Sequence, residues 1–314
     1  MEGNIAAPHW EDLTENEMTR LAKILKPVEI HSRRTQNAIT MHLTLLMQTL
    51  VNKLRDNGID INGVYLIGGA ASYVVSSVHI FNDIDLMMSV GAPNGYEEEK
   101  KLFNSIRDLV VKCIGQMTAS AGSQYFHKTH LTHNNNGDSW SLLSLYNMYG
   151  KNIELKFVLR LARDFVFSTD SIKVDISPQV FGLSGENRMT SSFGNLEVAK
   201  YHIQNRMIDT INPQQIKGGG FLKFVHLKCK KYKVAKKEKD LEQLLVAMTE
   251  GFLREPYQLE KYLANHFRQQ DVNYKIGFLR KFWDICNKPC LQIFSEDLER
   301  FKNTALEICR RLEQ

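Results

Sequence analysis

The sequence predicts an α+β protein, in which a mixed β-sheet with flanking helices is followed by a mostly helical C-terminal domain. Short apolar segments between residues 64 and 88, and alternating apolar and polar residues between 140 and 158, are typical of strands. After Pro178, apolar residues recur at helical spacing in almost every segment. We therefore expect a first domain over residues 1–185 packed across a cleft against a helical domain over 186–314, with the functional site at that cleft.

Composition limits the class of protein. Of the 314 residues, 43% are hydrophobic and 24% are charged, which excludes a disordered or fibrous chain. The five cysteines are scattered and form no Cys-x-x-Cys pair, so we expect reduced thiols rather than a disulfide framework or a zinc module. Residues 64–81 carry no formal charge, but their two glycines, three serines and histidine argue against a membrane span. A cytoplasmic protein fits these features.

The first half of the chain is predicted to mix helices and strands. Thr14 can cap a helix that Glu17 completes as a capping box and Pro27 ends. Leucines at helical spacing predict a second helix before Asn57-Gly58, and the apolar run before Gly68-Gly69 predicts a short strand. The expected elements are helices over 14–27, 40–56, 70–77 and 96–115 and strands over 64–67 and 80–88.

The second half changes from strands to helices. Residues 127–136 are polar and are expected to form a loop, and the three histidines there have no Cys or carboxylate at zinc spacing. Residues 148–152 are expected to turn a β-hairpin, and a third β segment follows it. The expected strands are 140–146, 153–158 and 165–176, and the expected helices are 196–208, 220–229, 241–252, 255–267, 274–286 and 295–312.

Two aspartates at alternate positions form the strongest local signal. On a strand, Asp83 and Asp85 point to the same face while Ile84 points into the core. Paired carboxylates repel each other unless a cation lies between them, and hard oxygen ligands suit Mg²⁺. A solvated strand end is the alternative for an Asp-x-Asp pair taken alone.

A glycine pair precedes these aspartates. Gly68 and Gly69 lie at a predicted strand-to-helix turn, with Ser72 in the helix that follows. Glycines let the backbone approach a ligand, and a helix start offers N–H groups to phosphate. A phosphate cradle beside a metal site is what a nucleoside triphosphate requires. We therefore predict that Gly68, Gly69 and Ser72 contact the nucleotide.

A third carboxylate is expected on a neighbouring strand, on the side of the attacking nucleophile. Glu154 is the best candidate, because the apolar residues around it alternate and leave Glu154 and Lys156 on the opposite face. A Glu–Lys pair on a solvated sheet face is the alternative. Asp170 and Asp175, on the next β segment, are further candidates.

Several sequence blocks together resemble a known family. Gly68-Gly69 followed by Asp83-Ile84-Asp85-Leu86 resembles the signature of the DNA polymerase β-like nucleotidyltransferases. The resemblance narrows to the family-with-sequence-similarity-46 proteins, or terminal nucleotidyltransferase 5 group of poly(A) polymerases, and runs from about His31 to Leu312. The blocks that carry it are 68–72, 82–86, 139–142, 150–158, 165–171, 212–223 and 263–267.

This resemblance implies a polynucleotide adenylyltransferase that adds AMP from ATP to the 3′ ends of RNA, including mRNA, with Mg²⁺ or Mn²⁺ in a two-metal mechanism. Asp83, Asp85 and Glu154 would be its catalytic metal ligands. Uridylation or mixed-nucleotide tailing is the alternative within enzymes, and an inactive RNA- or protein-binding scaffold is the alternative outside them. We recognise no sequence-specific RNA module, so we expect a protein adaptor to select targets.

A second glycine cluster and a lysine run complete the predicted site. Lys217, Gly218, Gly219 and Lys223 are predicted to contact the nucleotide, although glycines there also suit a tightly packed helix start. The lysine segment, residues 217–239, contains nine lysines and one glutamate; its charge of +8 leaves −3 for the rest of a chain whose net charge is +5. Aromatic residues interleave with these lysines, as in binding sites for single-stranded RNA, whereas a solvated helix face or a nuclear-import tract is the alternative. The predicted RNA contacts are Lys228, Lys230, Lys231, Lys233, Lys236 and Lys237.

Overall fold

The computed structural model describes residues 9–35, 37–93, 95–134, 137–161, 166–216, 218–254, 259–267 and 271–314. The chain divides into two compact units, an N-terminal unit over Met1–Gln204 and a C-terminal unit over Asn205–Gln314. The functional domains assigned from the sequence, with their boundary at 185/186 and a cleft between them, stay a prediction.

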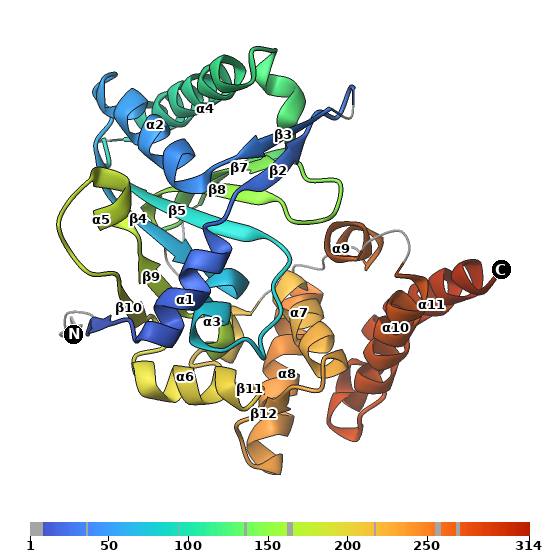
Figure 1. Cartoon of the computed structure of the whole chain (residues 1–314). Coiled ribbons are helices and arrows are strands. Elements are labelled where there is room, and N and C mark those ends of the chain that lie inside the picture. The colour runs from blue at the N-terminus through green and yellow to red at the C-terminus, as the bar shows by residue number, and fades with distance from the viewer. Residues whose placement is uncertain are drawn as a thin grey trace. The chain divides into compact units, whose positions relative to one another are not determined.

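A mixed sheet organises the N-terminal unit (Figure 1). Within the described residues it has eight strands in the order β1-β10-β9-β4-β5-β8-β7-β6, all antiparallel to their neighbours except the parallel pair β5/β8. This confirms the predicted α+β class. The strands are β1 (Glu11–Asp12), β4 (Ile61–Ile67), β5 (Ile84–Val90), β6 (Phe126–His133), β7 (Ser139–Leu145), β8 (Ile153–Arg160), β9 (Ile172–Asp175) and β10 (Arg188–Ser191).

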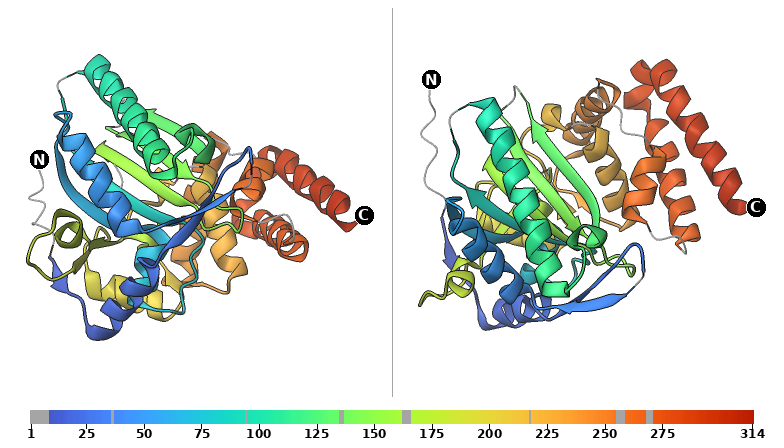
Figure 2. Two further views of the ribbon diagram at one scale, coloured as in Figure 1. Left: turned by 45° about the horizontal axis from the view of Figure 1, so that its top comes forward. Right: turned by 90° about the horizontal axis from the view of Figure 1, so that it is seen from above.

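Helices cover one face of this sheet. Helices α2 and α4 lie side by side over it, and Figure 2 shows the long α4 running along its strands. Apolar residues of both helices share one core with the sheet. The helices of the unit are α1 (Glu15–Ile24), α2 (Leu43–Arg55), α3 (Gly68–Val75), α4 (Tyr96–Thr118), α5 (Ser177–Phe181) and α6 (Leu196–Gln204), with the 3₁₀ turns η1 (Gly122–Tyr125) and η2 (Ser168–Asp170).

Alternation along β5 decides which side chains face the helices. Ile84, Leu86 and Met88 are at most 2% exposed and belong to the shared core. Because successive strand residues point to opposite faces, Asp85 lies on the other face of the sheet. The same alternation in β8 places Glu154 on that face too.

Several predicted elements are confirmed. Thr14 caps α1, and its capping box with Glu17 is complete: the Glu17 N–H donates to Thr14 Oγ1 at 3.4 Å, and the Thr14 N–H donates to Glu17 Oε2 at 2.9 Å. Strands β7 and β8 form the expected antiparallel hairpin.

Other expectations were wrong. The polar segment expected as a loop contains the edge strand β6, because pairing with β7 supplies the hydrogen bonds that its composition does not reveal. The strand expected from Ile80 begins only at Ile84. The segment expected as one strand over 165–176 contains η2 and the short β9, and Phe165 lies outside the described residues. Strands β1 and β10 were not expected, nor was the hairpin of β2 (Val28–His31) with β3 (Ala38–Met41).

Helices dominate the C-terminal unit, as predicted. Fully buried phenylalanines at positions 221, 252, 278 and 282 form its core. A short parallel pair, β11 with β12, was not expected. Its elements are β11 (Met207–Ile208), η3 (Pro213–Gln215), α7 (Gly218–Cys229), β12 (Lys233–Val234), α8 (Glu238–Arg254), α9 (Leu259–His266), α10 (Val272–Cys286), η4 (Pro289–Phe294) and α11 (Ser295–Glu313). No helix in the described part of the chain is both long and apolar enough to cross a bilayer.

Candidate active site

Two carboxylates lie side by side where the parallel strands begin. Asp85 of β5 is the register partner of Glu154 of β8. Neighbouring strands are about 4.8 Å apart, and register partners point to the same face, so these two acids stand next to each other on the face that α2 and α4 leave uncovered. The structure thus brings together two residues that the sequence analysis assigned to one site.

Asp83 joins this pair from the loop before β5. The expectation that it lies on the strand was wrong, since Ile84 is the first strand residue. The backbone N–H of Asn152, just before β8, donates to Asp83 Oδ1 at 3.3 Å. Burial and then the charge of Glu154 raise the pKa of the Asp83 carboxyl to about 7, against hydrogen bonds from Asn152 and the charge of Lys128. The Asp83 carboxyl therefore lies within the electrostatic influence of Glu154, and we define Asp83, Asp85 and Glu154 as the carboxylate site.

The glycine turn packs directly against this site. Gly68 has φ +66°, and a Cβ atom there would lie 2.7 Å from Asp85 Oδ2. Gly69 also has little room, because a Cβ would lie 3.2 Å from that of Phe81. Helix α3 starts at Gly68 without a side-chain cap, so its first N–H groups suit an anion. The turn therefore combines close backbone approach with an uncapped helix start, the two features on which the predicted phosphate cradle depends.

Ser72 is engaged within the fold. Its side chain is fully buried, and its hydroxyl donates to the carbonyl of Thr169 and lies 3.3 Å from that of Gly68. These contacts hold α3 against η2. The nucleotide contact expected of Ser72 stays a prediction.

The two other candidate carboxylates lie in different surroundings. Asp170 accepts hydrogen bonds from the N–H groups of Val166 at 3.0 Å and Phe167 at 3.1 Å. Asp175 accepts from the Ser177 N–H at 2.9 Å and is on β9, on the far side of β4 from β5. Each is used in a turn, whereas Glu154 is the neighbour of Asp85. The geometry therefore favours Glu154 as the third carboxylate.

The donor set fits a hard cation that is completed by a substrate. In the described part of the chain, no group of three or more His, Cys, Asp or Glu side chains is arranged to hold a metal ion by itself. Mg²⁺ commonly binds through one or two carboxylates, with waters and substrate phosphates as its other ligands. Oxygen ligands beside an uncapped helix start suit this kind of shared binding.

The second glycine cluster opens α7 of the C-terminal unit. Lys217 lies outside the described residues, while Gly218 and Gly219 are the first residues of the helix. A Cβ at Gly219 would meet nothing within 4 Å, so that glycine is not needed for packing. Lys223 follows on α7. It lies on the same helical face as Lys230, and both side chains are partly buried.

The predicted RNA-contacting lysines differ in exposure and in the groups that they contact. Lys228 donates to the carbonyl of Tyr232 at 2.9 Å, and burial followed by the charges of Lys281 and Lys288 lowers its pKa. Lys236 pairs with Asp209 at 2.8 Å. Lys230 is partly buried, and burial followed by the charge of Lys223 lowers its pKa. The exposed members are Lys231, Lys233 and Lys237.

The structure adds residues that the sequence analysis missed. Lys128 of β6 lowers the pKa of Asp83, and His127 next to it interacts electrostatically with Glu154. Burial lowers the pKa of the His127 imidazole, as do the charges of Arg33 and Lys128, while Glu154 raises it. Only the strand pairing brings these residues to the carboxylates, so no local sequence pattern identifies them.

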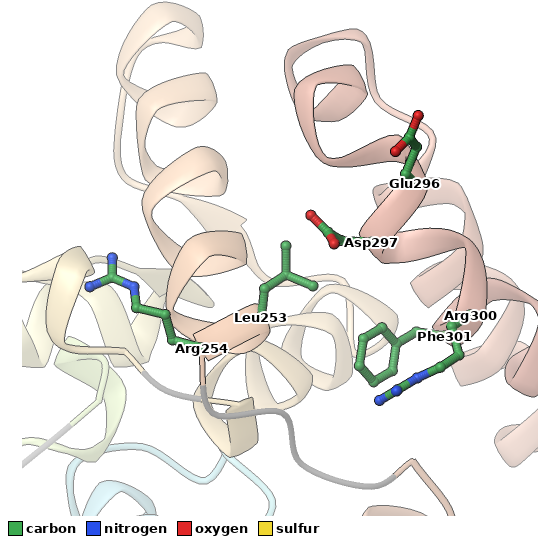
Figure 3. A pocket seen from close by; sticks show the side chains of 6 residues that line it. All are labelled: Leu253, Arg254, Glu296, Asp297, Arg300 and Phe301. Atoms are coloured by element: carbon green, nitrogen blue, oxygen red, sulfur yellow. The ribbon is translucent and has the colours of Figure 1, made fainter.

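Two concavities lie away from the carboxylates. One of about 560 Å³ lies in the N-terminal unit among α1, the end of α3 and α6. The other, of about 530 Å³, lies in the C-terminal unit, where Leu253 and Phe301 are flanked by charged residues of α8 and α11 (Figure 3). Neither contains a predicted site residue.

Comparison with known proteins identifies the family of this chain. A family model described as nucleotidyltransferase matches residues 13–306. Terminal nucleotidyltransferase 5C of Gallus gallus is 30% identical over 84% of this chain and 73% of its own length. The chain belongs to the terminal nucleotidyltransferase 5 family.

Other members and one solved structure show similar coverage. Terminal nucleotidyltransferase 5B of Xenopus tropicalis is 32% identical over 83% of this chain and 72% of its own length. A crystal structure of a tRNA nucleotidyltransferase with a primer tRNA and an ATP analogue aligns with a TM-score of 0.41 at 12% identity, over 80% of this chain and 62% of that one. The terminal nucleotidyltransferase 5 assignment rests on the sequence matches.

Proposed function

We propose that this protein is a poly(A) polymerase that transfers AMP from ATP to the 3′ end of RNA by a two-metal mechanism. The observation that carries the proposal is the pairing of Asp85 with Glu154 directly beside the Gly68 turn. Family membership supports nucleotidyl transfer, while the choice of ATP and RNA is our proposal. Asp83, Asp85 and Glu154 would hold Mg²⁺ or Mn²⁺.

The proposed reaction is an in-line displacement at phosphorus. The 3′ oxygen of the RNA forms a bond to the α-phosphorus of ATP, the bond between that phosphorus and the α–β bridging oxygen breaks, and pyrophosphate leaves with the bridging oxygen. The proton of the 3′ hydroxyl passes to solvent. A divalent cation bound here would neutralise charge that develops on the phosphate oxygens.

Different residues of the chain are proposed to bind different parts of the nucleotide or to shape its site. The N–H groups at the start of α3 hold the triphosphate, and Gly68 keeps the backbone close without displacing Asp85. Gly69 keeps the turn clear of Phe81. From the C-terminal unit we propose further nucleotide contacts at Lys217, Gly218, Gly219 and Lys223.

RNA binding, target choice and location complete the proposal. The exposed members of the lysine segment remain proposed backbone contacts. A protein adaptor would choose the mRNA targets, and the cytoplasm, with the nucleus as a second compartment, is the proposed location.

A nucleotide-selection assay tests the function. Purified protein is incubated with labelled oligo(A), Mg²⁺ or Mn²⁺, and each of the four NTPs separately. Extension with ATP in preference to the others supports the proposal. Preferential use of UTP would instead establish a uridylyltransferase. Absence of product with every NTP and both metals would favour the alternative of an inactive RNA- or protein-binding scaffold.

A further inference from the structure

The strand register fixes an order of chemical groups across the sheet. Ile67 at the glycine turn is the partner of Asp85, Asp85 of Glu154, Glu154 of Ser144 and Ser144 of Lys128. Register partners point to one face, so a single row runs from the proposed triphosphate cradle, through the carboxylates, to the edge strand β6. The carboxylates therefore have the glycine turn on one side and the edge strand β6 on the other.

The side beyond Glu154 leads to basic residues on the edge strand. Ser144 contributes a small, buried side chain whose hydroxyl has no hydrogen-bond partner. Beyond it, Lys128 is exposed on β6, about two strand spacings from Glu154. His127 is exposed at the irregularity where β6 shifts its register, and its ring lies 5.7 Å from that of Tyr146.

Arg33 is held next to this edge by its backbone. Its N–H donates to the Gln124 carbonyl at 2.9 Å, immediately before β6, and the N–H of His31 donates to the Tyr146 carbonyl at 2.8 Å. Ser32 Oγ donates to Gln124 Oε1 at 2.9 Å and accepts from the N–H of Arg34. The loop that carries the exposed Arg33 is therefore fixed against the start of β6. We call Arg33, His127 and Lys128 the basic rim.

We propose that the basic rim binds the last phosphodiester and the terminal base of the RNA that receives the nucleotide. This inference rests on the proposed function. The triphosphate would occupy the Gly68 side of the row, so the 3′ hydroxyl must approach from the Glu154 side, where the rim lies. Arg33 and Lys128 pair with phosphate, and the flat rings of His127 and Tyr146 offer a stacking surface for a base.

The combination of groups favours single-stranded RNA over a protein. Cations that follow a backbone, next to rings on which bases stack, are the usual elements of such sites. An edge strand can alternatively accept a strand from a partner protein, but that contact uses backbone groups and needs neither the cations nor the rings. A protein bound at β6 is therefore an outcome that the test can separate.

Equilibrium binding without ATP tests the rim independently of catalysis. Labelled linear oligo(A) and a circular oligo(A) of equal length, which lacks a 3′ end, are titrated with the full chain at several salt concentrations. The test variant is Arg33→Ala with Lys128→Ala. The control is Lys101→Ala with Lys112→Ala, because these exposed lysines lie on α4, which covers the opposite face of the sheet.

We expect the rim variant to bind linear oligo(A) about tenfold more weakly and circular oligo(A) almost unchanged. For the linear RNA, the slope of log affinity against log salt concentration should become shallower by about 1.4. Each lost phosphate contact to a single strand contributes about 0.7 to this slope. Arg33→Lys with Lys128→Arg should restore both values. His127→Phe should keep the affinity that His127→Ala lowers, because a flat ring remains.

Other results overturn the proposal. Unchanged binding of linear oligo(A), equal losses on linear and circular RNA, or an equal loss in the α4 control would each exclude a 3′-end site at the rim, and the first is also what a protein-docking role predicts. Lys128→Gln alone provides a milder variant if the double variant unfolds. Failure of the proposed function appears separately, as no extension by the parent protein with any NTP.

Discussion

The carboxylate site and the lysine segment relate sequence to structure in opposite ways. Glu154 is far from Asp83 and Asp85 in the chain, yet the strand register makes it the neighbour of Asp85. The lysines of residues 217–239 are close together in the chain, yet the fold gives them separate surroundings. Proximity in sequence therefore predicts shared surroundings in the fold less reliably than hydrogen-bonded register does.

The physical reason is the kind of element that carries each group. In β5 and β8, ladder hydrogen bonds and a buried opposite face fix both the position and the direction of each carboxylate. The lysine segment begins on α7, whose 3.6-residue period turns Lys223 and Lys230 to one side and Lys228 to another. Lys236 is then neutralised by Asp209. We expect changes at the carboxylate site to have much larger effects than changes in the lysine segment.

The largest expected effect is the loss of the paired aspartates. Asp83→Asn with Asp85→Asn should lower extension of oligo(A) by on the order of 10³-fold or more, because a bound cation contributes several kcal/mol to the transition state. Chelation of divalent ions should abolish the parent activity in the same assay. Asp108→Asn, an exposed carboxylate on α4, is the control. Full activity of the double variant would show that these aspartates are not the catalytic ligands.

A glycine substitution tests the fit between the turn and Asp85. Gly68→Ala places a methyl group 2.7 Å from Asp85 Oδ2, whereas Gly58→Ala has a similar positive φ and nothing within 4 Å. Both should cost about 1–2 kcal/mol of unfolding free energy, because each forces alanine into the left-handed region. Only Gly68→Ala should also lower kcat, by about 10- to 100-fold, through misplacement of the carboxylate. Equal kcat values for the two variants would contradict a role for this contact.

These two tests address features that the sequence revealed. Alternation of apolar residues predicted the β7–β8 hairpin, and the paired glycines predicted the turn, because both patterns are local. The α1 capping box is likewise a pattern of two residues. Alternation of the apolar residues around Glu154 made it the best candidate for the third carboxylate, and the family resemblance implied the same residue.

What the sequence missed depends on pairing between distant segments. Strand β6 is polar on both faces and becomes a strand only through β7, so its residues were expected in a loop. The hydrogen bond from Ser72 to the Thr169 carbonyl was not expected, because Thr169 comes from a different part of the chain. The basic rim was missed for the same reason. Long-range contacts, not propensities, decide each of these cases.

Within the lysine segment, His226 should affect stability rather than RNA binding. Its ring packs among Phe267, Tyr262 and other aromatic residues, and its buried Nε2 has no hydrogen-bond partner. Burial, and then Lys230, His266 and Lys223, lower the pKa of His226 from 6.5 to about 3.

Because this folded-state pKa is the lower one, the stability that His226 contributes is complete above pH 6.5 and is lost as the pH falls towards 3. The parent protein should lose about 2 kcal/mol more than His226→Phe between pH 7 and pH 5. Denaturant unfolding at both pH values measures the difference. Parallel losses in the two proteins would mean that His226 binds its proton equally well when folded.

Two lysines of the segment allow a test of whether a lysine must be exposed and unpaired by an acid to bind RNA. Lys233 is exposed, whereas Lys236 forms an ion pair with Asp209 at 2.8 Å. Lys233→Ala should weaken oligo(A) binding about threefold and lower the salt slope by about 0.7, while Lys236→Ala should change binding less. Titrations at several salt concentrations measure both quantities. A larger effect at Lys236 would show that the ion pair opens to the RNA and would restore the view of the segment as one continuous site.

The smallest expected effect concerns the backbone of Lys231. This residue has φ +64° at the end of α7, where its N–H donates to the Lys228 carbonyl at 3.1 Å and the Tyr232 N–H donates to that of Leu227 at 3.0 Å. Glycine is favoured in this helix-ending conformation, so Lys231→Gly should raise the unfolding free energy by about 0.5–1 kcal/mol. Lys231→Asn should give part of this gain and Lys231→Ala none, although all three variants remove the same charge. Denaturant unfolding of the three variants measures these changes. An equal gain in unfolding free energy in all three would mean that repulsion among the lysines, rather than backbone strain, sets the stability of this turn.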